Sequence, residues 1–117
     1  MAERLPLIGD VRGRDVVVVD DEVDTGGSIL NAVEMVKNHG ARNIYVVFVH
    51  AVLSLDAAEK MAALPVKQFI TTDTIQLPPS KRAVFGERIK VLTVADLLSE
   101  VILRANEGRS VGEMFNE

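Results

Sequence analysis

The chain has 117 residues, which is the size of one domain, and a formal net charge of −4. Nucleic acids and anionic membranes bind basic surfaces, so we expect neither of them as a partner. The sequence has no cysteine and no apolar run near the roughly 20 residues of a membrane span, which predicts a cytoplasmic protein without disulfides.

A polar lead-in over residues 1–10 precedes the stretch 16–29, which reads VVVVDDEVDTGGSI. Its four consecutive valines show no polar alternation and therefore predict a central parallel strand covered on both faces. Asp20 and Asp21 come at the carboxyl end of this strand, where open α/β sheets bind their ligands. Two carboxylates there can accept hydrogen bonds from a polyol or attract a hydrated divalent cation such as Mg²⁺.

A glycine-rich turn over residues 24–28 leads from this strand into an amphipathic helix expected over residues 28–39. Its two glycines permit positive φ angles and a close approach of the backbone, and Thr25 and Ser28 add hydroxyl donors. The first amides of the helix and its dipole point back into the turn. Together these features predict a site for a phosphate dianion.

The rest of the chain alternates between apolar strands and helices. Strands are predicted over residues 43–50, 66–72 and 89–92, with a short helix after Ser54 between the first two. Residues 73–88 contain the helix-breaking residues Pro78, Pro79 and Gly86 and are expected to form an ordered loop. A last long helix is expected to start at Thr93 and end at Gly108, with a further turn at its end. Its predicted buried face consists of Val94, Leu97, Leu98, Val101, Ile102 and Ala105.

These elements predict an α/β fold in one domain over residues 1–117, a parallel sheet of about four strands with helices on its faces. Four strands make a small sheet, so we expect an exposed edge or an uncovered face. Met114 and Phe115 form an apolar terminus that also needs a surface to dock on. Burial against another copy of the chain is the simplest remedy, and it predicts a small homo-oligomer.

The turn and its flanking acids resemble the phosphoribosyl-diphosphate loop of the type I phosphoribosyltransferase fold. The closer resemblance is to the C-terminal part of ribose-phosphate pyrophosphokinase, and it runs over residues 9–117. It includes segments beyond the loop: His39-Gly40-Ala41, a strand ending in His50, Val52-Leu53-Ser54, Thr74-Ile75-Gln76-Leu77-Pro78, Ser110-Val111 and Met114-Phe115.

The resemblance implies a truncated type I phosphoribosyltransferase fold and a role in nucleotide biosynthesis, in which ATP donates a diphosphoryl group to ribose 5-phosphate. The loop would then bind ribose 5-phosphate or phosphoribosyl diphosphate, with Mg²⁺ as cofactor at Asp20 and Asp21. No part of the 117 residues resembles the family's ATP-binding segments or its catalytic Lys and Arg, so we expect the chain alone to be inactive. The implied substrate-binding residues are Asp20, Asp21, Asp24, Thr25, Gly26, Gly27 and Ser28.

Two alternatives to a catalytic role remain open at the level of sequence. The chain fits a non-catalytic module that binds sugar phosphate or assembles with longer subunits. The run VVVVDDE also resembles the start of a phosphoacceptor receiver domain, but the next predicted strand ends in His50 and not in the expected Asp. For His50 itself, a hydrogen-bonded structural role is favoured over a role as a ligand.

Overall fold

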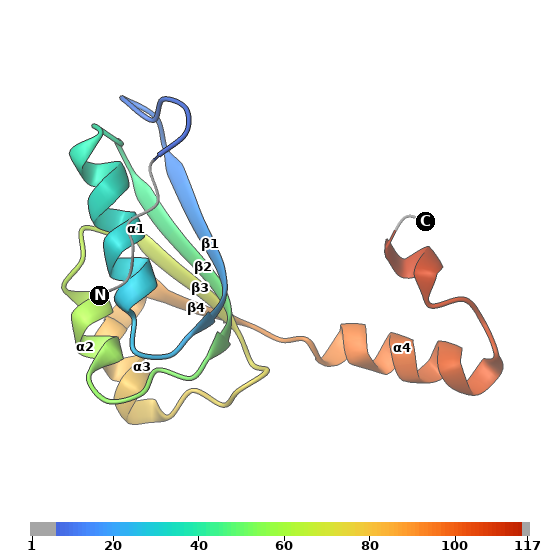
Figure 1. Cartoon of the computed structure of the whole chain (residues 1–117). Helices are drawn as coiled ribbons and strands as arrows, with labels where there is room; N and C mark the ends of the chain where they lie inside the picture. Colours follow the sequence, from blue (N-terminus) through green and yellow to red (C-terminus); the bar gives the residue numbers. More distant parts are fainter. Residues whose placement is uncertain (1–6, 116–117) are drawn as a thin grey trace.

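A four-stranded parallel sheet forms the centre of the fold, with the strand order β1-β2-β3-β4 (Figure 1). The structure, a computed structural model, describes residues 7–115; most of the predicted lead-in therefore lies outside the described residues. The elements in chain order are β1 (Val16–Val23), α1 (Gly27–Asn38), β2 (Ile44–Ala51), α2 (Ala57–Ala62), β3 (Gln68–Thr72), α3 (Pro79–Phe85), the 3-10 turn η1 (Gly86–Arg88), β4 (Ile89–Leu92), α4 (Ala95–Glu107) and the 3-10 turn η2 (Gly112–Phe115).

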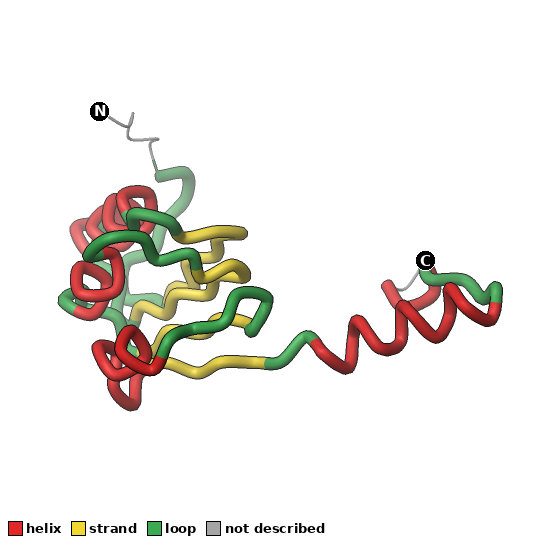
Figure 2. Tube along the Cα trace, turned by 90° about the horizontal axis from the view of Figure 1, so that it is seen from below, coloured by secondary structure: helices red, strands yellow, loops and turns green. Residues whose placement is uncertain are grey.

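Helices α1, α2 and α3 all cover the same face of this sheet, as Figures 1 and 2 show from two directions. Each helix connects one strand to its next neighbour, and the strands are added in a single direction across the sheet. Because such crossovers are right-handed, they all pass over the same face. The predicted parallel α/β fold is confirmed.

The core lies between this covered face and the three helices. Its largest fully buried side chains include Phe48 on β2, Met61 on α2 and Phe69 on β3. The rings of Phe69 and Phe85 meet edge to face, with their centroids 5.0 Å apart. Arg88 stacks over Phe69 and donates to the Val66 carbonyl at 2.8 Å, so it closes the core beside β3.

No helix among the described residues 7–115 covers the opposite face of the sheet. Val17 and Val19 are 57% and 70% exposed, so the prediction of a strand covered on both faces is wrong for β1. The reason is that β1 is an edge strand and that all three crossovers use the other face. We call this surface the open face; its apolar residues are Val17, Val19, Val47, Val49, Ile70 and Leu92.

Helix α4 extends away from the sheet beyond β4 (Figure 1), and the predicted burial of its apolar side is also wrong. None of the residues of α4, all of which are described, is buried, and Ile102 is 68% exposed. Within residues 7–115 no strand follows α4, so no crossover in this part of the chain brings the helix back onto the sheet. The radius of gyration of 16.8 Å accordingly exceeds the value of about 13 Å for a compact domain of this length. Within residues 7–115, no helix has the length and apolar character needed to cross a bilayer.

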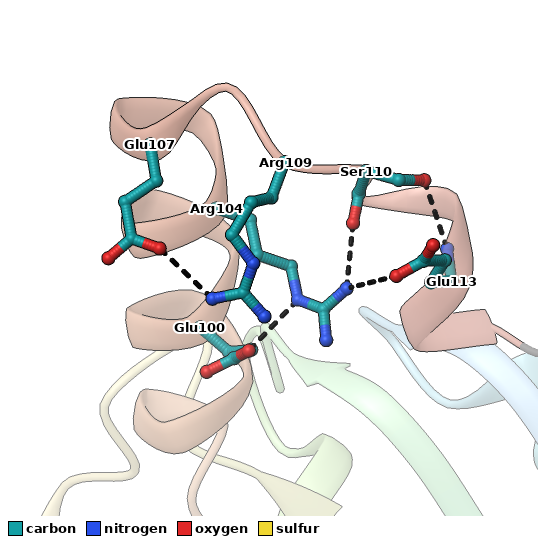
Figure 3. A network of polar contacts seen from close by, with 6 residues as sticks. All are labelled: Glu100, Arg104, Glu107, Arg109, Ser110 and Glu113. Carbon is teal, nitrogen blue, oxygen red and sulfur yellow. Dashed lines mark hydrogen bonds and ion pairs between the residues drawn. The ribbon is translucent and has the colours of Figure 1, made fainter.

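The two ends of α4 are held by polar contacts. At the start, Asp73 Oδ1 accepts a hydrogen bond from the Val94 amide at 2.8 Å, and Thr93 Oγ1 accepts one from the Ala95 amide at 3.1 Å. At the other end, Arg104 connects α4 to η2 (Figure 3). Its guanidinium contacts the Glu100 carboxylate at 2.9 Å and the Ser110 carbonyl at 2.7 Å. The predicted final turn is therefore present and packs against α4.

The region predicted as a loop over residues 73–88 contains α3, which sequence reading missed. Pro78 and Pro79 would break the interior of a helix, but proline is favoured at the first position of a helix, where its missing N–H needs no partner. Phe85 is buried against Phe69 and anchors the helix. The segment is thus an ordered cover of the core.

An ion pair at the amino end of the sheet gives a first testable prediction. Asp15 accepts hydrogen bonds from Arg42 Nε at 2.9 Å and Asn43 Nδ2 at 2.9 Å. The hydrogen bond from the Arg42 guanidinium lowers the pKa of the Asp15 carboxyl from 3.8 to about 2. A depressed pKa in the folded state stabilises the fold above the unfolded value and loses this effect as pH falls through the folded value.

We therefore expect Asp15→Asn to be less stable than the wild-type chain at pH 5 and the difference to shrink between about pH 4 and pH 2. Urea unfolding midpoints of both proteins at pH 5 and pH 2 measure this. Glu87→Gln, which removes a carboxyl outside this ion pair, is the control and should show no such convergence. A difference of the same size at both pH values would contradict the assigned pKa.

Candidate functional site

The predicted phosphate loop lies between the carboxyl end of β1 and the first turn of α1 (Figure 1). Strand β1 continues past the acidic pair to Val23, and α1 begins at Gly27. Gly26 caps the helix with φ 90°, and the Leu30 amide donates to its carbonyl at 2.9 Å. Only one of the two glycines therefore uses the left-handed conformation, because Gly27 has the ordinary backbone geometry of a helix residue.

The first turn of α1 presents donors that the helix itself does not use. The amides of Gly27, Ser28 and Ile29 have no carbonyl acceptor within the helix, because the first such bond runs from the Leu30 amide to the Gly26 carbonyl. They carry the positive end of the helix dipole. A Cβ built on Gly27 would meet no atom within 4 Å, so the backbone there is open to a close approach. These features together suit an anion such as a phosphate.

A pocket of about 450 Å³ lies at this turn. Its lining includes every predicted site residue except Asp21. It also includes Glu22, which sequence reading did not select as a site residue. The full lining is Asp20, Glu22, Val23, Asp24, Thr25, Gly26, Gly27, Ser28 and Ile29.

Strand alternation separates the two acids that the sequence places side by side. Because β1 continues to Val23, successive side chains point to opposite faces. Asp20 lines the pocket, whereas Asp21 follows Val17 and Val19 on the side of the open face. The same period would have indicated Glu22 as the next residue on the pocket side. The assignment of Asp21 to the site stays a prediction.

The pocket is acidic. Three carboxylates line it, from Asp20, Glu22 and Asp24, and no Lys or Arg side chain is among its lining residues. No three carboxylate or imidazole groups of residues 7–115 lie close enough to form a complete metal site. Mg²⁺ is commonly held by only one or two carboxylates together with substrate phosphates and water, and this donor set fits that mode.

A second loop, after β2, supports the phosphate loop through its backbone. The Leu53 amide donates to the Val23 carbonyl at 2.9 Å, and the Ser54 amide donates to the Asp24 carbonyl at 2.9 Å. On the other side, Lys81 Nζ of α3 donates to the Leu53 carbonyl, so this lysine has a structural partner. Leu53 and Leu55 have positive φ angles of 49° and 54°, which are strained for leucine and typical of segments held in place at functional sites.

His50 lies at the end of β2, beside Glu22 in the register of the two strands. Its Nδ1 is 2.8 Å from Thr74 Oγ1, and the Thr74 hydroxyl in turn donates to the Val49 carbonyl at 3.2 Å. His50 is not among the residues that line the pocket. The structure thus gives it the hydrogen-bonding partner that the favoured structural role requires.

Comparison with known proteins places this geometry in a family. Residues 2–116 match the family model of the phosphoribosyl synthetase-associated domain. A ribose-phosphate pyrophosphokinase of Caldanaerobacter subterraneus subsp. tengcongensis is 44% identical over 115 residues, which are 98% of this chain and 35% of that protein. Another from Nostoc sp. is 41% identical over 98% of this chain and 34% of its own length.

A solved structure agrees with these relatives. The phosphoribosylpyrophosphate synthetase of Mycobacterium smegmatis superposes with a TM-score of 0.80 at 33% identity, covering 86% of this chain and 33% of that one. The chain thus spans about a third of the length of the curated relatives it matches. These matches overturn the receiver alternative, as does the observed strand order, because receiver sheets have the order 2-1-3-4-5.

Proposed function

Because the chain belongs to the phosphoribosyl synthetase-associated domain family, we propose that its loop between β1 and α1 binds ribose 5-phosphate or phosphoribosyl diphosphate. The observation that carries this proposal is the pocket itself. It combines free helix amides and hydroxyls on one side with carboxylates on the other. A pentose 5-phosphate needs both kinds of group, donors for its phosphate and acceptors for its hydroxyls.

Each part of the ligand has a matching part of the pocket. The phosphate oxygens accept hydrogen bonds from the amides of Gly27 and Ser28 and from the hydroxyls of Thr25 and Ser28. The Asp20 carboxylate accepts hydrogen bonds from the ring hydroxyls, and charge-assisted bonds of this kind are the stronger ones. Asp24 shapes the turn, since its carbonyl is fixed by the Ser54 amide.

Mg²⁺ belongs to the proposal because an anionic ligand has to enter an acidic pocket. Asp20, which lines the pocket, is the carboxylate that we propose for the ion, while the role of Asp21, on the other side of β1, stays a prediction. When bound, Mg²⁺ neutralises part of the negative charge that the ligand and the carboxylates share. In the complete family enzyme, the proposed reaction is transfer of a diphosphoryl group from ATP to ribose 5-phosphate.

The test is a calorimetric titration of the purified chain with ribose 5-phosphate in the presence of Mg²⁺, repeated after removal of the ion with EDTA. We expect saturable binding with Mg²⁺ and at least about tenfold weaker binding without it, which corresponds to about 1.4 kcal/mol. Ribose without the phosphate is the control ligand and should bind far more weakly. An absence of heat with all ligands at millimolar concentration would refute the proposal.

A second prediction follows for the carboxylate on the pocket side. We expect Asp20→Asn to weaken ribose 5-phosphate binding by about ten- to a hundredfold, because a hydrogen bond to a charged group contributes about 1.5–3 kcal/mol. Asp15→Asn is the matched control, since Asp15 directly precedes the same strand and is paired with Arg42 at the end away from the pocket. Equal affinities of Asp20→Asn and the wild-type chain would remove the hydroxyl-acceptor role.

A non-catalytic sugar-phosphate module is the second candidate function, and one observation favours it. The pocket lining has no cationic side chain that could stabilise the negative charge of a nucleoside triphosphate such as ATP. Both functions share the same ligand, so the titration supports either of them. Because the chain alone is expected to be inactive in either case, AMP release from ATP separates the two only when the chain is assayed together with a longer subunit of the family.

A further inference from the structure

We propose that Lys81 of α3 is a positioning residue for the phosphate loop, on which it acts through the loop between β2 and α2. We call this connection, residues 52–56, the support loop. It runs between the phosphate loop and α3 (Figure 1). The inference rests on the proposed function, in which the phosphate loop binds ribose 5-phosphate. It adds a residue outside the pocket lining to the groups on which binding depends.

A chain of hydrogen bonds connects Lys81 to the phosphate loop. Lys81 Nζ donates to the carbonyl of Leu53, and the amide of Leu53 donates to the Val23 carbonyl at 2.9 Å. The next amide, that of Ser54, donates to the Asp24 carbonyl at 2.9 Å. Val23 and Asp24 lead directly into the glycine turn, so the position of their carbonyls determines where the phosphate donors lie.

The support loop needs such contacts because its backbone is strained. Leu53 and Leu55 have φ angles of 49° and 54°, which side chains other than glycine rarely adopt. Leu55 is 86% exposed, so the packing of its side chain does not impose this conformation. Among residues 7–115, Lys81 is the one donor to the partly buried Leu53 carbonyl, and removal of its amine leaves that carbonyl unpaired.

Helix α3 gives the lysine a fixed base. Phe85, at the end of this helix, is buried and meets the ring of Phe69 edge to face. Lys81 comes four residues before Phe85, so the two side chains lie on the same side of α3. The long aliphatic stem of a lysine can follow the protein surface while its amine reaches a polar partner. Loss of the amine therefore leaves α3 anchored and removes only the contact with the support loop.

Titration of two Lys81 variants of the 117-residue chain with ribose 5-phosphate and Mg²⁺ tests the proposal. Lys81→Met keeps an aliphatic stem without the amine, and we expect it to bind at least about tenfold more weakly than the wild-type chain. Lys81→Arg keeps a cationic donor and should restore most of the affinity. If Lys81→Met does not fold, Lys81→Gln takes its place with the same expected loss, because its side chain is one bond shorter than that of lysine.

Arg88→Met is the matched control. Arg88 is also a partly buried cation that donates to a backbone carbonyl, that of Val66 at 2.8 Å, but it does so before the amino end of β3. The pocket lies at the carboxyl edge of the sheet, so this variant should lower the thermal unfolding midpoint and leave the affinity for ribose 5-phosphate unchanged. A loss of affinity in Arg88→Met equal to that in Lys81→Met would overturn the proposal, because general destabilisation would explain both.

Amide hydrogen exchange, followed by NMR without ligand, tests the link itself. In Lys81→Met, we expect the Leu53 and Ser54 amides to exchange at least about tenfold faster than in the wild-type chain, while the amides of β2 keep their rates. Weaker binding with unchanged exchange would overturn the proposal, because Lys81 would then act on the ligand through its charge. Faster exchange with unchanged affinity would overturn it too, because the support loop would then not position the phosphate donors.

The same measurements separate this inference from the proposed function. A wild-type chain that binds no ribose 5-phosphate would refute the proposed function. The exchange rates of the Leu53 and Ser54 amides would then by themselves support or overturn the link between Lys81 and the phosphate loop.

Discussion

Replacement of Gly27 by Val is expected to abolish ribose 5-phosphate binding, with a loss of at least about a hundredfold, while the protein stays folded. The two parts of this expectation come from one observation. A Cβ at Gly27 meets no protein atom within 4 Å, so the folded chain accommodates the new side chain. The space that the side chain enters is the pocket in front of the α1 amides, where we propose that the phosphate lies.

Two further variants separate the binding effect from changes in stability. Ser80→Val places the same side chain in the first turn of α3, outside the pocket, and should leave binding unchanged. Gly26→Ala, in contrast to Gly27→Val, should mainly lower the stability of the fold. Because Gly26 has φ 90°, an alanine there costs about 1–2 kcal/mol of stability from backbone strain. Its Cβ would meet Ala57, Leu30 and Met61 only at ordinary contact distances of 3.8 Å, so the cost is conformational and not steric.

Titration with ribose 5-phosphate and thermal unfolding measure the two properties for each variant. A Gly27→Val protein that is folded and binds with wild-type affinity would remove the phosphate-cradle assignment. A Gly27→Val protein that unfolds would instead contradict the open backbone at this position. The conservative variant Gly27→Ala then serves as the second test of the cradle, since its smaller side chain should still weaken binding.

Local signals in the sequence were sufficient for the positions of the strands, of α1 and of the glycine turn between β1 and α1. The valine run, the glycine turn and the apolar spacing of α1 all act within a few residues, and the structure follows them. The turn at His39 and Gly40 is an example. Gly40 has φ 87°, and the Ala41 amide donates to the Val36 carbonyl at 3.0 Å, which is the predicted helix end.

Features that depend on the whole chain were not predictable in this way. An apolar stripe indicates that a surface is favoured to be buried, but it does not indicate whether another segment of this chain packs on it. The stripe on α4 and the outer valines of β1 therefore predict burial, although nothing within the described residues covers them. The same applies to the support of the site. The contacts of Leu53 and Ser54 with the phosphate loop are backbone hydrogen bonds, which no pattern of side chains in the sequence predicts.

The separation of Asp20 from Asp21 shows how one structural fact changes a functional reading. As neighbours in the sequence, they form an acidic pair that suggests a single ligand site. Strand β1 continues beyond them, so the pleat directs only Asp20 toward the pocket, together with Glu22. Which carboxylates point into the same pocket therefore depends on where the strand ends, and not only on the presence of two neighbouring acids in the sequence.

The second large effect is expected in catalysis: the 117-residue chain, produced alone, should release no AMP from ATP in the presence of ribose 5-phosphate and Mg²⁺. Transfer of a phosphoryl-type group depends on positive groups that neutralise the charge developing on the transferred oxygens. The pocket instead supplies negative groups: Asp20, Glu22 and Asp24 are in its lining, and no cationic side chain is.

Lys81 of α3 reaches the loop that supports the pocket, but its Nζ donates to the Leu53 carbonyl and so holds the fold. We therefore expect the ligand to bind and ATP to remain uncleaved. The matched positive control is the ribose-phosphate pyrophosphokinase of Caldanaerobacter subterraneus subsp. tengcongensis, which is 44% identical over 115 residues, in the same assay. AMP release by the purified chain that requires both ribose 5-phosphate and Mg²⁺, and that Gly27→Val abolishes, would show that this acidic pocket is a complete active site.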